Sequence, residues 1–141
     1  MTKELQDKLY EKYPKIFRQK DLSMQETCMC WGIECGDGWF MLIDELCRTL
    51  QWNTDHNNRA ESGTEGNHPQ IEAVQVKEKF GGLRFYTNGE TDKQQGAISF
   101  AESLSFKICE RCGSTDEVEQ TKGHWISTMC KKCMDKKPEN A

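Results

Sequence analysis

Apolar residues recur at three- and four-residue intervals in three segments of the chain, which is the spacing of an amphipathic helix. The helices predicted in this way cover residues 3–13, Asp37–Trp52 and Thr91–Cys109. Pro14 ends the first helix, because the residue before a proline is biased away from helical conformation. Asp37 suits the N-cap of the second helix, whose regular apolar stripe predicts that it is the central buried helix. Thr91 and Gln94 stand at the two positions of a capping box for the third helix.

Residues 73–88 alternate apolar and polar side chains, as the strands of a β-hairpin do. Gly81 and Gly82 interrupt the alternation, and a two-residue hairpin turn needs residues that accept positive φ. We therefore expect the turn at these two glycines. In that register Phe80 faces Leu83 across the hairpin.

The polar composition of residues 53–70 predicts a long surface loop, and loops of this length are usually functional or mobile. Its two histidines, His56 and His68, are interpreted as solvated rather than catalytic. Together these patterns predict an α+β fold, in which about three helices pack on a small antiparallel hairpin or sheet.

The C-terminal part of the chain carries two C-x2-C pairs. Cys109 and Cys112 form the first pair and Cys130 and Cys133 the second, with seventeen residues between the pairs. Each short spacing lets the backbone turn so that both sulfurs face one point, and four thiolates arranged in this way suit tetrahedral zinc. A closed site of this kind has no open coordination position, so the predicted ion is structural rather than catalytic.

The residues between the two pairs predict a hairpin with Lys122-Gly123 at its turn, and residues 130–137 predict a short helix ended by Pro138. A knuckle, a hairpin and a short helix make a treble clef, whereas the same unit without the helix is a zinc ribbon. The predicted divisions of the chain are residues 1–107 as an α+β body, residues 108–137 as the zinc-binding module and residues 138–141 as a disordered tail.

A pair of disulfides, or a set of free buried thiols, is the alternative interpretation of the same four cysteines. No apolar run follows the first residues, Met1 to Glu4, so the sequence predicts no signal peptide. Disulfides are rare in the reducing cytoplasm, which is the compartment that this absence favours. We therefore expect zinc.

Four further cysteines, Cys28, Cys30, Cys35 and Cys47, lie in the N-terminal half of the chain. The C-x-C-x4-C spacing of the first three is not that of a standard metal knuckle. Reduced cysteine is among the most buried residue types, so small core residues are favoured. A second metal ion or a reactive thiol is the alternative.

The bulk composition limits the possible partners of the protein. The chain has 141 residues, of which only 35% are hydrophobic, so its core must be small. The net charge of -4 argues against general electrostatic attraction to nucleic acid, although it allows a local basic patch. No segment has the apolar length that spans a membrane.

One face of the predicted hairpin carries the possible partner-binding or anion-binding residues Lys77, Lys79, Arg84 and Tyr86. In the expected register Lys79 lies opposite Arg84, and this pair is repulsive unless an acidic group meets it. That group is either external, such as a phosphate backbone, a nucleotide or an acidic protein surface, or internal. The internal candidates are Glu34, Asp37 and Asp44.

Three motifs carry a resemblance to a known family. They are MCWGIECGDGW at residues 29–39, VKEKFGGLRFY at residues 76–86, and the paired cysteines of residues 109–133. Together they resemble a family of small phage and prophage proteins of unassigned function. The resemblance implies a bacteriophage or mobile-element origin and action in the cytoplasm of a bacterial host, but it implies no reaction and no site residues.

Three classes of function are consistent with these observations. The first is a zinc-binding interaction protein that inhibits a bacterial host protein or an anti-phage defence factor, in an anti-CRISPR or similar role. The second is a regulatory protein that binds nucleic acid or a nucleotide through the basic hairpin face and the zinc module. The third is an enzyme with a nucleophile among Cys28 to Cys35, which we do not favour, because the chain has none of the phosphate-loop, G-x-S-x-G or H-E-x-x-H motifs.

Overall fold

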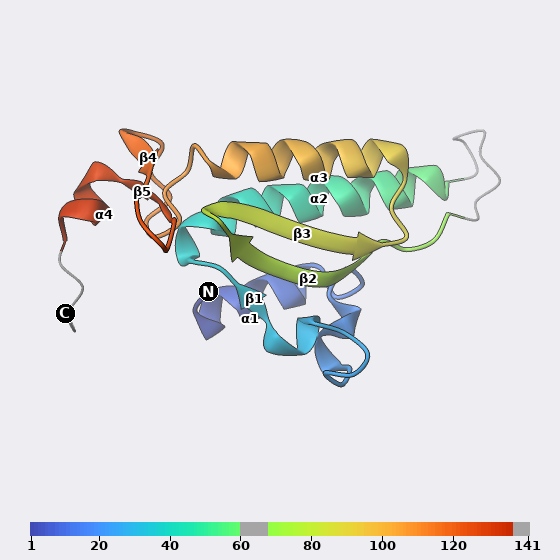
Figure 1. Cartoon of the computed structure of the whole chain (residues 1–141). Coiled ribbons are helices and arrows are strands. Elements are labelled where there is room, and N and C mark those ends of the chain that lie inside the picture. The colour runs from blue at the N-terminus through green and yellow to red at the C-terminus, as the bar shows by residue number, and fades with distance from the viewer. Residues whose placement is uncertain (60–67, 137–141) are drawn as a thin grey trace.

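The computed structural model describes residues 1–59 and 68–136. These residues contain two small β-sheets and four α-helices, joined by turns and loops (Figure 1). The α+β class is therefore confirmed. The predicted tail, residues 138–141, lies outside the described residues. In chain order the elements are α1 (Lys3–Lys12), β1 (Ile33–Glu34), α2 (Phe40–Asn57), β2 (Glu72–Lys79), β3 (Gly82–Asn88), α3 (Asp92–Ser105), β4 (Val118–Gln120), β5 (Thr128–Cys130) and α4 (Lys131–Asp135). Short 3-10 turns lie at Arg18–Asp21, Met29–Trp31 and Asp37–Trp39.

The larger sheet has the strand order β1-β2-β3, with β1 parallel to β2 and β2 antiparallel to β3. Figure 1 shows α2 and α3 side by side along the β3 side of the sheet, with α1 nearer to β1. Lys12 and Tyr13 at the end of α1 donate to the Asp44 carboxylate of α2, so the three helices share one core. Side chains of α3 cover the outer edge of β3, because the amides of Leu83 and Phe85 donate to Ser105 Oγ and Glu102 Oε2 at 2.9 and 3.0 Å. The edge of the sheet is thereby closed to further strand pairing.

The core of the body forms around α2. Ile43, Cys47 and Leu50 on this helix are fully buried, as is Trp39 just before it. The apolar stripe of the sequence thus identified the central helix correctly.

The bounds of α2 differ from the prediction at both ends. Asp37 is not its N-cap, since its carboxylate instead accepts a hydrogen bond from the Thr2 amide at 2.7 Å. The helix also continues through residues 53–57, which were expected in a loop. Asn53 and Thr54 are buried in this part of the helix, and the buried amide of Gln94 donates to Leu50 O and Thr54 Oγ1 at 3.0 and 2.8 Å, which joins α2 to α3.

The capping box of α3 is confirmed, with Thr91 and Gln94 bonded reciprocally. The helix ends at Ser105, however, and not at Cys109. Ser105 is buried, and its hydroxyl accepts from the Leu83 amide and donates to Glu102 O. The chain therefore leaves the helix where a serine anchors it to the sheet.

The hairpin forms as predicted, but its turn lies one residue earlier, at Phe80-Gly81. Both residues adopt positive φ, 53° and 85°. Gly82 instead belongs to β3, where a Cβ would lie only 2.4 Å from the ring of Phe106. Its lack of a side chain serves this close approach rather than the turn.

The shifted turn changes the partners across the hairpin while keeping the two faces of each strand. Lys77 lies opposite Arg84 and Lys79 opposite Gly82, so the expected Lys79–Arg84 pair is wrong. Glu78, in turn, lies opposite Leu83.

The smaller sheet is an antiparallel pair of β4 and β5, which leads directly into α4 at one end of the molecule (Figure 1). The expected hairpin and short helix are both present, but the tight turn predicted at Lys122-Gly123 is wrong, because Gln120 pairs with Thr128 and residues 121–127 form a longer loop. Among the described residues, no helix combines the length and apolar character needed to cross a membrane.

Candidate metal centre

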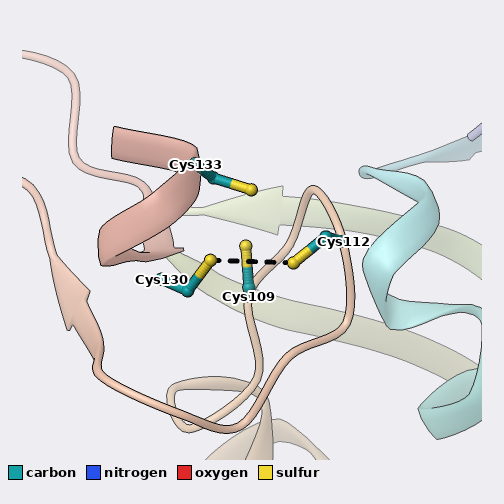
Figure 2. A group of neighbouring side chains, drawn as sticks. All are labelled: Cys109, Cys112, Cys130 and Cys133. Atoms are coloured by element: carbon teal, nitrogen blue, oxygen red, sulfur yellow. Dashed lines mark hydrogen bonds between the residues drawn. The ribbon is translucent and has the colours of Figure 1, made fainter. Parts of the chain in front are cut away.

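The structure brings Cys109, Cys112, Cys130 and Cys133 together in one cluster (Figure 2). Their four sulfur atoms all lie within 4.8 Å of one another. The first two come from the turn that follows α3, the third ends β5, and the fourth stands in the first turn of α4. None of the eight cysteines, all of which lie among the described residues, forms a disulfide.

Local backbone geometry holds the first pair of sulfurs in place. The amide of Gly113 donates to Cys109 O at 2.9 Å, and the amide of Cys109 donates to Ser114 O at 2.8 Å. Gly113 has a φ of +82°, which favours glycine, and this conformation closes the turn around the pair. The C-x2-C-G pattern therefore encodes a metal-type knuckle.

Apart from the cysteines, the C-terminal module has almost no core. Cys109, Cys130 and Cys133 are buried, and among the described residues only Val118 and Met129 pack against them as partly buried apolar side chains. Apolar burial on this scale does not hold about thirty residues in a fixed fold. The cluster itself must supply the missing stability.

The electrostatics of the cluster favour a bound cation. Burial opposes ionisation of Cys109, but backbone hydrogen bonds from Cys130, Cys112 and Arg111 lower the pKa of its thiol to about 6. Burial and the neighbouring cysteine side chains raise the pKa of Cys133 to about 12. A metal ion bound among the four sulfurs would favour the thiolate form of each of them.

A Gly-Asp-Gly-Trp segment of the body receives the knuckle directly. The Gly38 amide donates to Glu110 O at 2.8 Å, and the Gly36 amide donates to Glu110 Oε2 at 2.8 Å. The indole of Trp39 donates to Ile108 O at 2.9 Å. A Cβ at Gly38 would lie 2.1 Å from Cys109 O, so only glycine allows this approach.

The turn of the β2–β3 hairpin makes a second contact with the module. Thr128 of β5 is buried, and its hydroxyl donates to Gly81 O. Its carbonyl accepts from the Glu110 amide at 3.0 Å, which ties the hairpin of the module to the knuckle. The sequence did not predict the contacts that the module makes at Gly38 and Gly81, although these glycines stand in the motifs of residues 29–39 and 76–86.

The predicted basic face is only partly assembled. Lys77 and Arg84 are neighbours across β2 and β3, but Glu34 of β1 stands beside Lys77 in the same row. Tyr86 pairs with Gln75, and Lys79 lies over the ring of Phe80 at 5.7 Å. Within the described part of the chain, none of these three cations has a carboxylate within 4.0 Å.

Two of the three proposed internal partners are engaged elsewhere, while the third, Glu34, lies beside Lys77 without an ion pair within 4.0 Å in the described part of the chain. Asp44 accepts hydrogen bonds from Lys12 and Tyr13, and Asp37 accepts one from Thr2. Arg84 and Tyr86 line a hollow of about 800 Å³ whose other walls include three carboxylates, from Glu26, Glu90 and Glu102. The face is therefore mixed in charge rather than uniformly basic.

The remaining cysteines divide between the core and the surface. Cys35 and Cys47 are buried, and burial raises the pKa of Cys35 to about 12. Cys30 is half-buried and Cys28 is exposed, so the expectation of a core position is wrong for Cys28. His56 stacks on Trp52 at a ring separation of 4.9 Å on the surface of α2.

Comparison of the chain with protein-family models, with curated proteins and with solved structures finds no match. The chemistry of the site is therefore inferred from the residues of the chain alone.

Proposed function

We propose that the four cysteines hold one structural zinc ion in a treble-clef module. The sulfur atoms of Cys112 and Cys130 lie 3.7 Å apart. Four ligands at about 2.3 Å in a tetrahedron have their sulfurs about 3.8 Å apart, so this pair has the spacing of zinc ligands. All four sulfurs lie within 4.8 Å of one another. The order of knuckle, hairpin and helix, with two ligands from the knuckle and two from the start of the helix, supports the treble clef over the plain ribbon.

Bound zinc would act here on folding rather than on catalysis. Four protein thiolates fill its tetrahedron and leave no position for water or substrate. The free energy of metal binding then becomes folding free energy for the module, which has so little core of its own.

We further propose that the protein acts by binding another protein. The observation that supports this best is a pair of exposed aromatic residues, Phe80 and Trp125, which are 68% and 78% exposed on two adjacent turns. Large aromatic side chains held at the surface on rigid turns are typical energetic centres of protein interfaces. The narrower role, inhibition of a bacterial host or anti-phage defence factor, rests on the family resemblance and is part of the same proposal.

Elemental analysis of the purified protein tests the zinc site. We expect one zinc ion per chain, and loss of most of it in Cys112→Ser. Cys28→Ser is the matched control, since Cys28 is an exposed thiol outside the cluster and its substitution should leave the zinc content unchanged. Protein that lacks metal, with the four cysteines oxidised to one another, contradicts the proposal.

Affinity capture from a nuclease-treated bacterial lysate tests the binding role. A host protein that is retained by the wild-type chain, is lost with Trp125→Ala, and binds again in purified form supports it. Retention that does not depend on Trp125 argues against this assignment of the surface.

A nucleic-acid-binding role is the second candidate, and it rests on the adjacent Lys77 and Arg84, which have no ion pair within the described residues. Lys122, Lys131 and Lys132 of the module are also exposed. Binding to single-stranded and double-stranded oligonucleotides at low and high salt decides this point. A steep loss of affinity with salt that is abolished by Lys77→Glu with Arg84→Glu supports it, and absence of binding at low salt contradicts it.

A further inference from the structure

Phe80 and Trp125 lie at the tips of the β2–β3 and β4–β5 turns, and together they line one surface hollow of about 250 Å³. Ile126 lies between them, with its Cγ2 atom 3.3 Å from where a Cβ of Gly81 would stand. The two turns are thus packed against each other. Their exposed rings line the same hollow, and we call this apolar surface the Phe80–Trp125 ridge.

The ridge borders a larger cleft of about 790 Å³ between the body and the module. Alternate residues of one segment, Trp125, Ser127 and Met129, form one wall of this cleft, while Ile126 and Thr128 face the body. Trp125 therefore belongs to both the ridge and the cleft, and a ligand on one would extend into the other.

The cleft is acidic. Four carboxylates line it, from Glu34, Asp37, Glu78 and Glu110. The positive groups on its walls are the amino group of Met1 and Arg111, and none of the four carboxylates has an ion pair within 4.0 Å in the described part of the chain.

Backbone amides of the protein hold three of these carboxylates in position. Asp37 accepts from Thr2 N at 2.7 Å, Glu78 accepts from Gly81 N at 3.0 Å and Glu110 accepts from Gly36 N at 2.8 Å. Each retains lone pairs for a further donor. Their orientation is set before any partner arrives, which reduces the entropic cost of binding one.

We propose that the Phe80–Trp125 ridge and the adjoining cleft form one docking surface for a basic segment of a partner protein. The partner would place an apolar side chain on the ridge and a lysine or arginine side chain in the cleft, where a guanidinium can also stack on the Trp125 indole. This inference rests on the proposed function as a binding protein and adds the location and the chemistry of its contact.

Charge decides between a protein and a nucleic acid as the occupant. Exposed aromatic residues also stack on bases, and Lys79 and His124 lie beside the ridge. A phosphate backbone that follows the ridge would, however, run past the four carboxylates of the cleft, whereas a basic peptide is attracted by them.

Selection of random dodecapeptides displayed on phage, against immobilised zinc-loaded full-length protein, tests the proposal without prior choice of a sequence. We expect enriched peptides with an excess of arginine or lysine next to an apolar residue. Fluorescence anisotropy of an enriched peptide should then show an affinity loss of about thirtyfold for Trp125→Ala. Glu34→Lys should lower the affinity and weaken its salt dependence.

Two surface variants serve as matched controls. Trp31→Ala removes another exposed tryptophan, which lines a separate hollow with Tyr10 and Met29. Glu11→Lys reverses another exposed carboxylate, which belongs to α1. Neither should change peptide affinity by more than about twofold, a range typical of energetically neutral positions.

Four results overturn the proposal. They are no enrichment, enriched peptides without a basic excess, equal losses for Trp125→Ala and Trp31→Ala, and a single-stranded oligonucleotide that competes for the site. The zinc content of the same sample distinguishes failure of the docking surface from failure of the zinc module. Fully zinc-loaded protein that selects no basic peptide refutes the docking surface alone, whereas protein without zinc refutes the proposed zinc module, and the docking surface with it.

Discussion

At Gly38 a single missing side chain lets the metal-type knuckle lie directly on the body. The backbone amide of this residue donates to Glu110 O, and a Cβ atom would stand 2.1 Å from Cys109 O and 2.6 Å from Glu110 O. Both neighbours are backbone atoms, which do not move aside as the end of a flexible side chain would. The close contact at Gly38 thus holds the knuckle of the cysteine cluster against the body, next to the buried core residue Trp39.

Gly38→Ala is therefore expected to lower the free energy of unfolding of the zinc-loaded protein by about 2 kcal/mol or more, because the knuckle and the body must separate. Urea denaturation measures this change. Gly96→Ala is the matched control, since no atom lies within 4 Å of the added Cβ in α3, and the better helix propensity of alanine should add about 0.5 kcal/mol or more. Equal effects of the two substitutions would show that the close approach at Gly38 is not tight.

A hydrogen-bonded ion pair between Arg18 and Glu72 joins the turn at Arg18–Asp21 to the start of β2. Arg18 donates to the Glu72 carboxylate through two nitrogens, at 2.7 and 2.9 Å, and Gln19 donates to it at 3.0 Å. The Arg18 hydrogen bond, opposed by partial burial, lowers the pKa of Glu72. The carboxylate therefore contributes stability above its ordinary pKa, and this contribution is lost as the pH falls through the lower folded-state value.

Glu72→Gln should accordingly destabilise the protein by about 1 kcal/mol at neutral pH, a modest figure because Arg18 is largely exposed. The difference from wild type should shrink as the pH falls below about 4.5, where the unfolded-state carboxyl becomes protonated. Urea denaturation at a series of pH values, with Arg18→Gln and the double variant completing a cycle, measures it. A pH-independent difference would mean that the pair adds nothing through charge.

At the scale of elements, the β2–β3 turn shows a conflict between local conformation and residue type. Phe80 has a φ of 53°, a left-handed conformation that costs a residue with a Cβ about 1 kcal/mol, yet its ring is 68% exposed. The fold itself would be served as well by glycine. Local strain of this kind is characteristic of positions that are kept for a function.

We expect Phe80→Gly to keep or raise the free energy of unfolding, by up to about 0.5 kcal/mol, while it weakens binding at the ridge. The gain is small because the contact of the Lys79 ammonium with the ring is lost at the same time. Thermal denaturation measures the first effect and the peptide assay the second. Phe80→Val, a β-branched residue that resists positive φ, should destabilise, and a loss of more than 1 kcal/mol in Phe80→Gly would contradict a strained turn.

The sequence predicted those elements whose signals are local. The C-x2-C pairs, the capping box at Thr91 and the apolar stripe of α2 all depend on short-range chemistry, and the structure contains each of them. The hairpin was found, but its register was not, because three consecutive positions, Phe80 to Gly82, could supply the turn. Gly82 pairs with Lys79 in the strand, where the ring of Phe106, distant in sequence, leaves no room for a side chain.

The parts that sequence reasoning missed depend on contacts between distant segments. Residues 53–57 are polar, yet they are helical, with Asn53 and Thr54 buried and the Thr54 hydroxyl accepting a hydrogen bond from the Gln94 amide of α3. Strand β1 has two residues, too few for an alternation to show. The acidic cleft arises only when the end of β1 meets the C-terminal module, so no segment alone could indicate it.

At the scale of the whole molecule, two clusters of buried residues of very different size meet at the Gly36–Trp39 segment. Among the described residues, the larger one fills the body from Leu9 to Ala101, and the smaller one consists of three cysteines with two partly buried apolar neighbours. Only the first has the apolar burial to stay folded without metal. The stability of the two parts should therefore respond differently to loss of the ion.

Removal of metal with a strong chelator should release the module while the body stays folded. We expect amide hydrogen exchange to accelerate by about a hundredfold or more in β4, β5 and α4, since each opened region loses the free energy of metal binding. The amides of α2 and of β2 should keep most of their protection. Added zinc should restore the protection of the module, and uniform loss across both parts would show instead that the body depends on the cysteine cluster.

Because Trp125 lies in the module and Phe80 in the body, removal of metal should also separate the two rings and abolish peptide binding, although both residues remain in the chain.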